Sequence, residues 1–136
     1  MSKEKKVFLT REAILNADDI EKREVFIPEW NGYVIVRGMS GKERDAYEAS
    51  IVKQRGKDTQ VNMKNARAKL VALCTIDETG KRLFTEADVV ALSQKSAKAL
   101  DRIFAVAMEL SGISQDDLEE LTKNSEETTS EGLFLD

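Results

Sequence analysis

The sequence predicts a mainly helical α+β fold, in which an N-terminal β-hairpin is followed by a bundle of about four to five helices. The chain has 136 residues but only one proline, Pro28, and seven glycines, which favours long helices over many short strands. Two segments near Pro28 are rich in β-branched and aromatic residues, as strands are. Beyond residue 40, apolar residues recur mostly at helical spacing.

The N-terminal elements are a short helix and the hairpin. Thr10 is placed to cap a turn or two of helix within the charged first 23 residues. Residues 24–28 and 33–37 are the expected strands, and Asn31-Gly32 between them readily adopts positive φ. The proline at the end of the first strand loses no ladder hydrogen bond there.

The helices that follow are marked by their first residues. Ser40 and Glu43 form a capping box, in which each side chain can satisfy a free backbone amide at the start of a helix. Thr85 and Ser96 are placed to open two more helices, and Gly112 stands where a helix often ends. The predicted helices cover residues 40–55 and 62–75, a short stretch after Thr85, a longer one after Ser96, and a last one from Ser114.

The chain length fits one compact domain. We expect an N-terminal segment at residues 1–23, a single globular domain at 24–124 and a flexible acidic tail at 125–136. Cys74, which lies among apolar residues, is expected to be a buried thiol in a reducing cytoplasm. No run approaches the roughly 18–20 apolar residues of a membrane span, and no signal peptide is evident.

The residue types exclude most catalytic chemistry. The absence of histidine removes the commonest general base and most zinc sites, and one cysteine cannot build a thiolate cluster. Carboxylates are plentiful, but no spacing singles out a catalytic pair. We therefore predict a protein without catalytic, metal or cofactor sites. The net charge of −4 also disfavours nucleic acid as a partner.

Two features indicate protein partners instead. Trp30, beside Tyr33 and Phe26, lies at the predicted hairpin tip, where it either anchors an interface or packs back onto the helices. The segment from Ser114 carries eight acidic residues and one lysine, a net charge of −7. It ends in three apolar residues that predict either a short binding motif or part of a solubilising tail: Leu133, Phe134 and Leu135.

The N-terminus has the opposite charge. Four basic residues stand there against Glu4, namely Lys3, Lys5, Lys6 and Arg11. This asymmetry predicts weak, salt-dependent self-association between the basic start and the acidic tail.

Residues 25–44 resemble the front of the tail assembly chaperones of Gram-positive phages and prophages, of the siphophage or myophage type. The resemblance rests on Pro28, Trp30, Gly32, the Val-Ile-Val-Arg strand and Ser-Gly-Lys-Glu-Arg at 40–44. Residues 72–88 resemble the family's next segment, which leads into a helix here marked by Leu92, Lys95, Ser96, Ala99 and Leu100. With Glu-Leu-Ser-Gly at 109–112 and Lys-Asn-Ser at 123–125, the similarity covers roughly residues 24–125.

The resemblance implies a non-enzymatic protein of the bacterial host cytoplasm. Such proteins bind the tape-measure protein, keep it soluble and help recruit the major tail protein, without nucleic acid or membrane. Many are also made in a longer, frameshifted form. The family supplies no catalytic residues to carry over.

Two alternatives follow from the residues themselves. The helix at 62–75 has a basic face formed by Lys64, Arg67 and Lys69, which would suit a small DNA-binding regulatory protein of a phage or prophage. An enzyme that uses carboxylates alone would instead need a cleft that raises the pKa of one of them.

Overall fold

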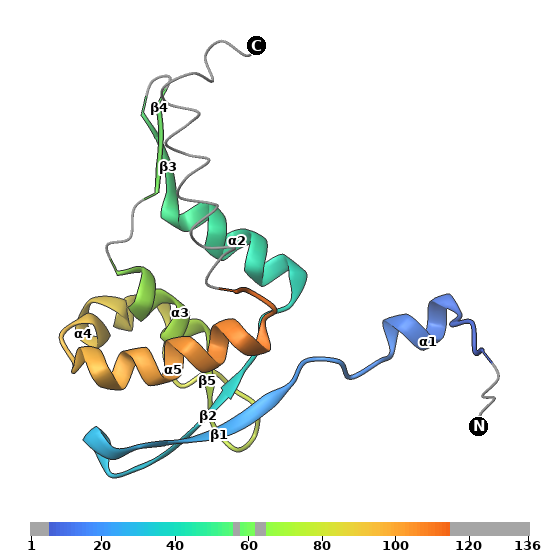
Figure 1. The fold of residues 1–136 in the computed structure, drawn as a ribbon, viewed down its shortest axis with the longest axis horizontal. Helices are drawn as coiled ribbons and strands as arrows, with labels where there is room; N and C mark the ends of the chain where they lie inside the picture. Colours follow the sequence, from blue (N-terminus) through green and yellow to red (C-terminus); the bar gives the residue numbers. More distant parts are fainter. Residues whose placement is uncertain (1–5, 56–57, 62–64, 115–136) are drawn as a thin grey trace.

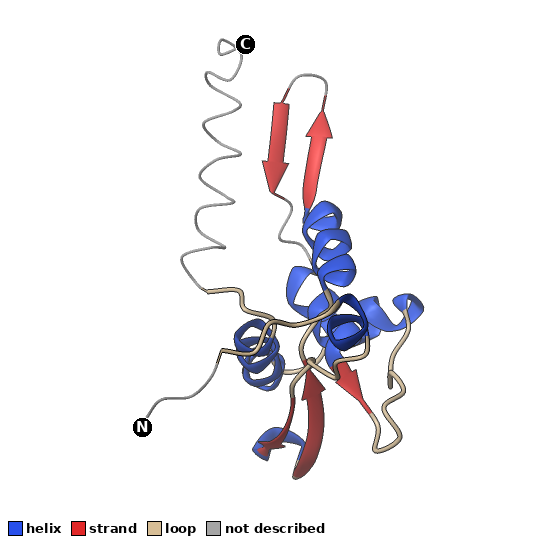
Figure 2. Ribbon diagram, turned by 90° about the vertical axis from the view of Figure 1, so that its right-hand side faces the viewer, coloured by secondary structure: helices blue, strands red, loops and turns tan. Residues whose placement is uncertain are grey.

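The structure, a computed structural model, describes residues 6–55, 58–61 and 65–114 (Figures 1 and 2). The expected class is confirmed: the fold is mixed α+β, and an N-terminal antiparallel hairpin precedes four α-helices in the described residues. The elements are α1 (Arg11–Leu15), β1 (Lys22–Ile27), η1 (Pro28–Trp30), β2 (Gly32–Arg37), α2 (Gly41–Ile51), β3 (Val52–Arg55), β4 (Asp58–Val61), α3 (Ala66–Cys74), β5 (Thr75–Ile76), η2 (Glu86–Asp88), α4 (Val89–Ser93) and α5 (Ala97–Leu110).

A three-stranded antiparallel sheet of order β1-β2-β5 forms one layer of the domain. In the hairpin, Lys22 pairs with Arg37 at the open end and Ile27 with Gly32 at the tip. The turn has the predicted positive φ at Asn31, whose φ is 52°, and the Asn31 amide donates to the Pro28 carbonyl at 3.1 Å. Helix α5 lies along the hairpin and contacts both of its strands (Figure 1).

The hydrophobic core lies between the sheet and the helices. Helix α3 is buried almost all round, as a central helix is, and contacts both α4 and α5. Helix α5 is amphipathic and begins at Ser96, whose side chain accepts from the Ala99 amide as predicted. The largest fully buried side chains are Ile27, Val36, Ile51, Leu70, Val71, Cys74, Thr75 and Ile103.

The sequence did not predict β3, β4 and β5. Helix α2 ends at Ile51 rather than near Arg55, and the chain then forms a second antiparallel hairpin, β3–β4, that projects away from the first sheet (Figures 1 and 2). Helix α3 begins at Ala66, after Asn65 in the left-handed region, rather than at residue 62. The helix expected from Ser114 and the tail at 125–136 lie outside the described residues, so the division into segments stays a prediction.

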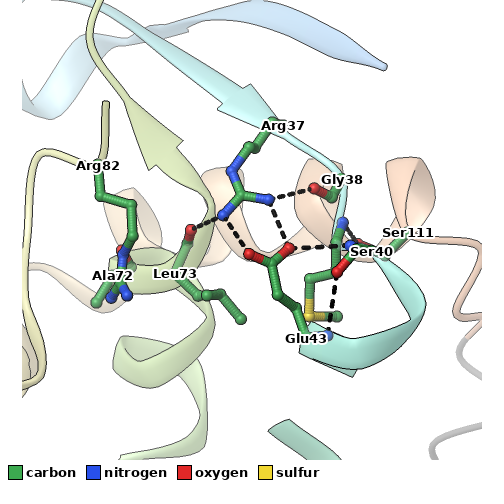
Figure 3. Close-up of polar contacts among 9 residues, drawn as sticks. Arg37, Gly38, Ser40, Glu43, Ala72, Leu73, Arg82 and Ser111 are labelled. Atoms are coloured by element: carbon green, nitrogen blue, oxygen red, sulfur yellow. Dashed lines mark hydrogen bonds and ion pairs between the residues drawn. The ribbon is translucent and has the colours of Figure 1, made fainter. Parts of the chain in front are cut away.

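Arg37, at the end of β2, joins three elements through its guanidinium (Figure 3). Nη1 and Nη2 donate to the two Glu43 carboxylate oxygens at 2.7 and 2.9 Å, so α2 is tied to the sheet. The same nitrogens donate to the Gly38 carbonyl at 3.0 Å and to the Leu73 carbonyl of α3 at 3.1 Å. Glu43 also completes the predicted capping box, since it accepts from the Ser40 amide while Ser40 Oγ accepts from the Glu43 amide.

The link between β2 and α2 packs closely against the end of α5. A Cβ added at Gly38 would lie 2.5 Å from the Leu110 carbonyl oxygen, which only a glycine permits. Next to it, the Met39 amide donates to Ser111 Oγ at 2.9 Å. These contacts fix where α5 ends relative to the sheet.

Glu43→Gln should destabilise the protein in a pH-dependent way. The hydrogen bonds from Arg37 hold the pKa of Glu43 at about 2, below its ordinary value of 4.5. The stabilisation is therefore complete above about pH 4.5 and is lost as the pH falls towards about 2. Because about a third of the side chain is exposed, we expect a loss of about 1–2 kcal/mol near neutral pH.

Urea denaturation across this pH range measures the effect. The difference between wild type and variant should shrink as the solution is acidified. Glu48→Gln, which removes the more exposed Arg44–Glu48 pair on the same helix, should cost under about 0.5 kcal/mol. A difference that stays constant down to about pH 2 would contradict this account.

Gly38→Ala should cost about 2–4 kcal/mol, because the new methyl group collides with the backbone of Leu110. Gly41→Ala is the matched control, since a Cβ there meets nothing within 4 Å. It should leave stability unchanged or raise it by up to about 1 kcal/mol at the start of a helix. Equal unfolding midpoints for the two variants would show that α5 does not need this close approach.

Candidate protein-binding surface

The sheet has an inner and an outer face, and the outer one exposes apolar side chains. Along the hairpin, Ile27 and Val36 point to the inner face and are fully buried. Phe26 and Tyr33, directly opposite each other, point the other way and are 47% and 70% exposed. Their ring centroids are 5.1 Å apart and tilted by 57°, the geometry of an attractive aromatic pair.

A shallow hollow of about 440 Å³ continues this face beyond β2. Tyr33, Ile35 and the half-exposed Leu83 supply part of its apolar lining. Three carboxylates also line it, those of Glu24, Asp77 and Glu78, without a basic side chain. We call Phe26, Tyr33, Ile35 and Leu83, together with these three carboxylates, the outer face.

Asp77 is held in place by its own loop. Its Oδ1 accepts from Thr79 Oγ1 at 2.6 Å and from the Lys81 amide at 3.0 Å. The hydrogen bond from the Thr79 side chain, followed by that from the Lys81 amide, lowers the pKa of Asp77, so this carboxylate is charged at neutral pH. These hydrogen bonds hold the residues after Asp77 in a turn, and the outer face carries fixed negative charge.

Trp30 lies in η1 at the hairpin tip and is 37% exposed. The turn packs against α5, and Arg102 of α5 donates to both Glu29 carboxylate oxygens at 2.8 and 3.0 Å. The turn therefore folds back onto a helix while the indole remains partly accessible, and the role of Trp30 as an interface anchor stays a prediction. Leu133, Phe134 and Leu135 lie outside the described residues, and their binding role stays a prediction.

A second, larger hollow of about 830 Å³ lies between α3, α5 and the residues after α5. Phe104, Met108 and Ile113 form most of its apolar lining. Its two carboxylates, Asp101 and Glu109, already form ion pairs with arginines. No pattern in the sequence predicted this hollow, because its lining comes from elements far apart in the chain.

The basic helix face is largely occupied within the protein. Arg67 forms an ion pair with Asp101, and Lys69 Nζ donates to the Ser50 carbonyl at 3.2 Å. Lys64 lies outside the described residues. Since two of the three basic groups already have partners in the chain, the arrangement disfavours the DNA-binding alternative.

The described residues offer little for covalent or metal chemistry. Cys74 is fully buried, and burial raises the pKa of its thiol to about 12. Within the described ranges, no group of three or more His, Cys, Asp or Glu residues could hold a metal ion. No helix there is long and apolar enough to cross a membrane.

An exposed apolar face on a small, well-packed domain is typical of a protein that works by binding other proteins. A comparison with protein-family models matches residues 9–128 to the phage tail assembly chaperones. The chain therefore belongs to the phage tail assembly chaperone family, which is non-catalytic. This confirms the resemblance over most of the chain, while the Gram-positive host type stays a prediction. Comparisons with curated proteins and with solved structures gave no match.

The burial of Cys74 predicts an unreactive thiol. In the native protein, a disulfide reagent such as DTNB should modify it at least about 100-fold more slowly than in urea, because only the exposed thiolate reacts. Absorbance during the reaction measures both rates on the same chain. Fast, complete modification of the native protein would contradict the burial of Cys74.

Proposed function

We propose that this protein binds the tape-measure protein of a phage tail in the bacterial host cytoplasm, keeps it soluble and helps recruit the major tail protein. Family membership supports the chaperone role. The observation that carries the proposal for this chain is the exposed aromatic pair, Phe26 and Tyr33, on the outer face of a rigid sheet.

The outer face suits an apolar client for physical reasons. Both aromatic rings lie on strands whose opposite face is anchored in the core, so little conformational entropy is lost when a partner covers them. Aromatic residues also contribute disproportionately to interface energy. Trp30 at the tip and Leu133 to Leu135 in the tail are proposed as additional contacts.

The carboxylates beside the aromatic pair give the face a charge preference. Glu24 and Glu78 form no ion pair within the described part of the chain, and Asp77 is charged. We infer that the client segment is apolar and carries a basic residue nearby. Such a segment gains from both kinds of contact, whereas an acidic one is repelled.

Co-expression with the neighbouring tape-measure gene product, followed by pull-down, tests the function. Wild type should keep the tape-measure protein soluble and co-purify with it. Tyr33→Glu should weaken capture at least about tenfold, because it places a charge at the centre of the apolar contact.

Val90→Glu is the matched control, since Val90 is a comparably exposed apolar residue on α4, outside the outer face. It should bind like wild type. If the tape-measure protein stays insoluble and unbound with wild type, the proposed function is wrong. If both variants bind equally well, the function stands but the outer face is not the contact.

A further inference from the structure

Strand β1 forms one edge of the three-stranded sheet, and its free side is long. The strand order is β1-β2-β5, so β1 pairs with β2 on one side and with no described strand on the other. It runs over six residues, of which only Ile27 is buried. An unpaired strand edge of this kind is a template to which another strand can add.

The hydrogen-bond pattern shows which backbone groups of β1 point outward. In an antiparallel pair, directly opposite residues alternate between a pair that exchanges both of its hydrogen bonds and a pair that directs these groups away from each other. The Gly38 amide donates to the Glu21 carbonyl at 3.0 Å, so this pair at the open end of the hairpin is a bonded one. Alternate residues of β1 therefore bond to β2, and the amides and carbonyls of the set between them point to the free edge: Lys22, Glu24 and Phe26.

The other side of the sheet leads to the same assignment. The Leu83 amide donates to the Thr75 carbonyl at 3.0 Å, so the backbone groups of Thr75 are directed away from β2. The next residue, Ile76, therefore bonds to β2, where it lies opposite Ile35. Because the amide and carbonyl of Ile35 point to β5, its partner on β1, Glu24, is not bonded to it. The backbone groups of Glu24 accordingly point to the free edge.

The side chains of the same set define the segment that would fit beside them. Phe26 is 47% exposed, and Lys22 and Glu24 are exposed and form no ion pair among the residues that the structure describes. A strand beside β1 places its own alternate side chains directly opposite these three, where opposite charges attract and apolar groups pack. The fitting segment therefore carries an apolar, a basic and an acidic residue at alternate positions, opposite Phe26, Glu24 and Lys22.

We propose that an extended segment of the tape-measure protein adds as a strand to the free edge of β1. This inference rests on the proposed function for the identity of the client, and it gives the client a conformation and a sequence pattern. The client backbone bonds to the outward amides and carbonyls of Glu24 and Phe26, while its basic and apolar side chains cover the same two residues. A helical segment could not make this contact, because its own amides and carbonyls are bonded within the helix.

Glu24→Pro tests the backbone contact without breaking the hairpin. The Glu24 amide points to the free edge, so the proline ring removes an outward donor and leaves the hydrogen bonds between β1 and β2 intact. Glu24→Ala is the matched control, because it removes the same carboxylate but keeps the amide. Circular dichroism and urea denaturation should show both variants folded.

Pull-down of the co-expressed tape-measure protein measures the two effects. Glu24→Ala should weaken capture at most about fivefold, as expected for the loss of one exposed ion pair. Relative to Glu24→Ala, Glu24→Pro should weaken capture at least about tenfold further, because a client carbonyl is left without its donor.

Amide hydrogen exchange at single residues tests the same contact in the wild-type chain, whether or not Glu24→Pro folds. In the chain alone, the outward amides of Glu24 and Phe26 should exchange rapidly, whereas the inward amides of Arg23 and Val25 should be protected. In the complex with the tape-measure protein, exchange at Glu24 and Phe26 should slow at least about tenfold.

Three results would overturn the proposal. If folded Glu24→Pro captures the client as well as Glu24→Ala, or if Glu24 and Phe26 exchange as fast in the complex as alone, the client does not pair with β1. Wild-type capture then leaves the proposed function standing. Protection of these amides in the chain alone, rising with protein concentration, would place a second copy at the edge instead. A tape-measure protein that wild type does not capture overturns the proposed function and this inference together.

Discussion

The half-buried guanidinium of Arg37 is the constraint on which the rest of the fold depends. A cation at the boundary of an apolar core is tolerated only if its donors are satisfied, and this one is satisfied by groups from separate elements. Its carboxylate partner Glu43 sets where α2 begins, and the Leu73 carbonyl sets where α3 passes the end of β2. The adjoining Gly38 then lets α5 approach within contact distance of the same link. One side chain thereby fixes the directions in which the helices leave the sheet.

Buried apolar side chains hold the hairpin against α5. Ile27 and Val36 are fully buried, and burying one such side chain contributes about 1.5–3 kcal/mol. The ion pairs Arg23–Glu109 and Glu29–Arg102 connect the same two elements, but solvent screens both of them and weakens their contribution to stability. The apolar contacts therefore carry the stability, while the ion pairs contribute to the orientation of the hairpin. The outer face is rigid because its reverse side is part of the core.

The elements that were predicted correctly from the sequence are those that depend only on residues a few positions apart. The capping residues Ser40 and Ser96 act within three residues of themselves, and the turn at Asn31 requires only its own φ. Strand β5 could not be predicted in this way, because Thr75–Ile76 continues the apolar pattern of α3. These residues form a strand only because they pair with the edge of β2.

The difference between local and long-range contacts also explains how much of the candidate binding surface could be predicted from the sequence. Tyr33 could be proposed as a contact from the sequence because an aromatic residue near a turn is a local signal. Its pairing with Phe26 on the solvent side needs the strand register, and Leu83 joins them from a loop far along the chain. The carboxylates that give this face its charge come from both regions. The β-branched and aromatic residues of the hairpin were visible in the sequence, but not which alternate set of side chains the helices would cover.

Because consecutive residues of β1 and β2 point to opposite sides, the hairpin holds two sets of side chains that can change independently. A substitution at Ile27 or Val36 opens a cavity in the core, whereas one at Phe26 or Tyr33 leaves packing on the other side of the strand untouched. Selection can therefore alter the exposed set without first restoring the stability of the core. Under the proposed function, the chaperone could then follow a client whose sequence drifts, because its fold is kept while the residues proposed to touch the client are exchanged.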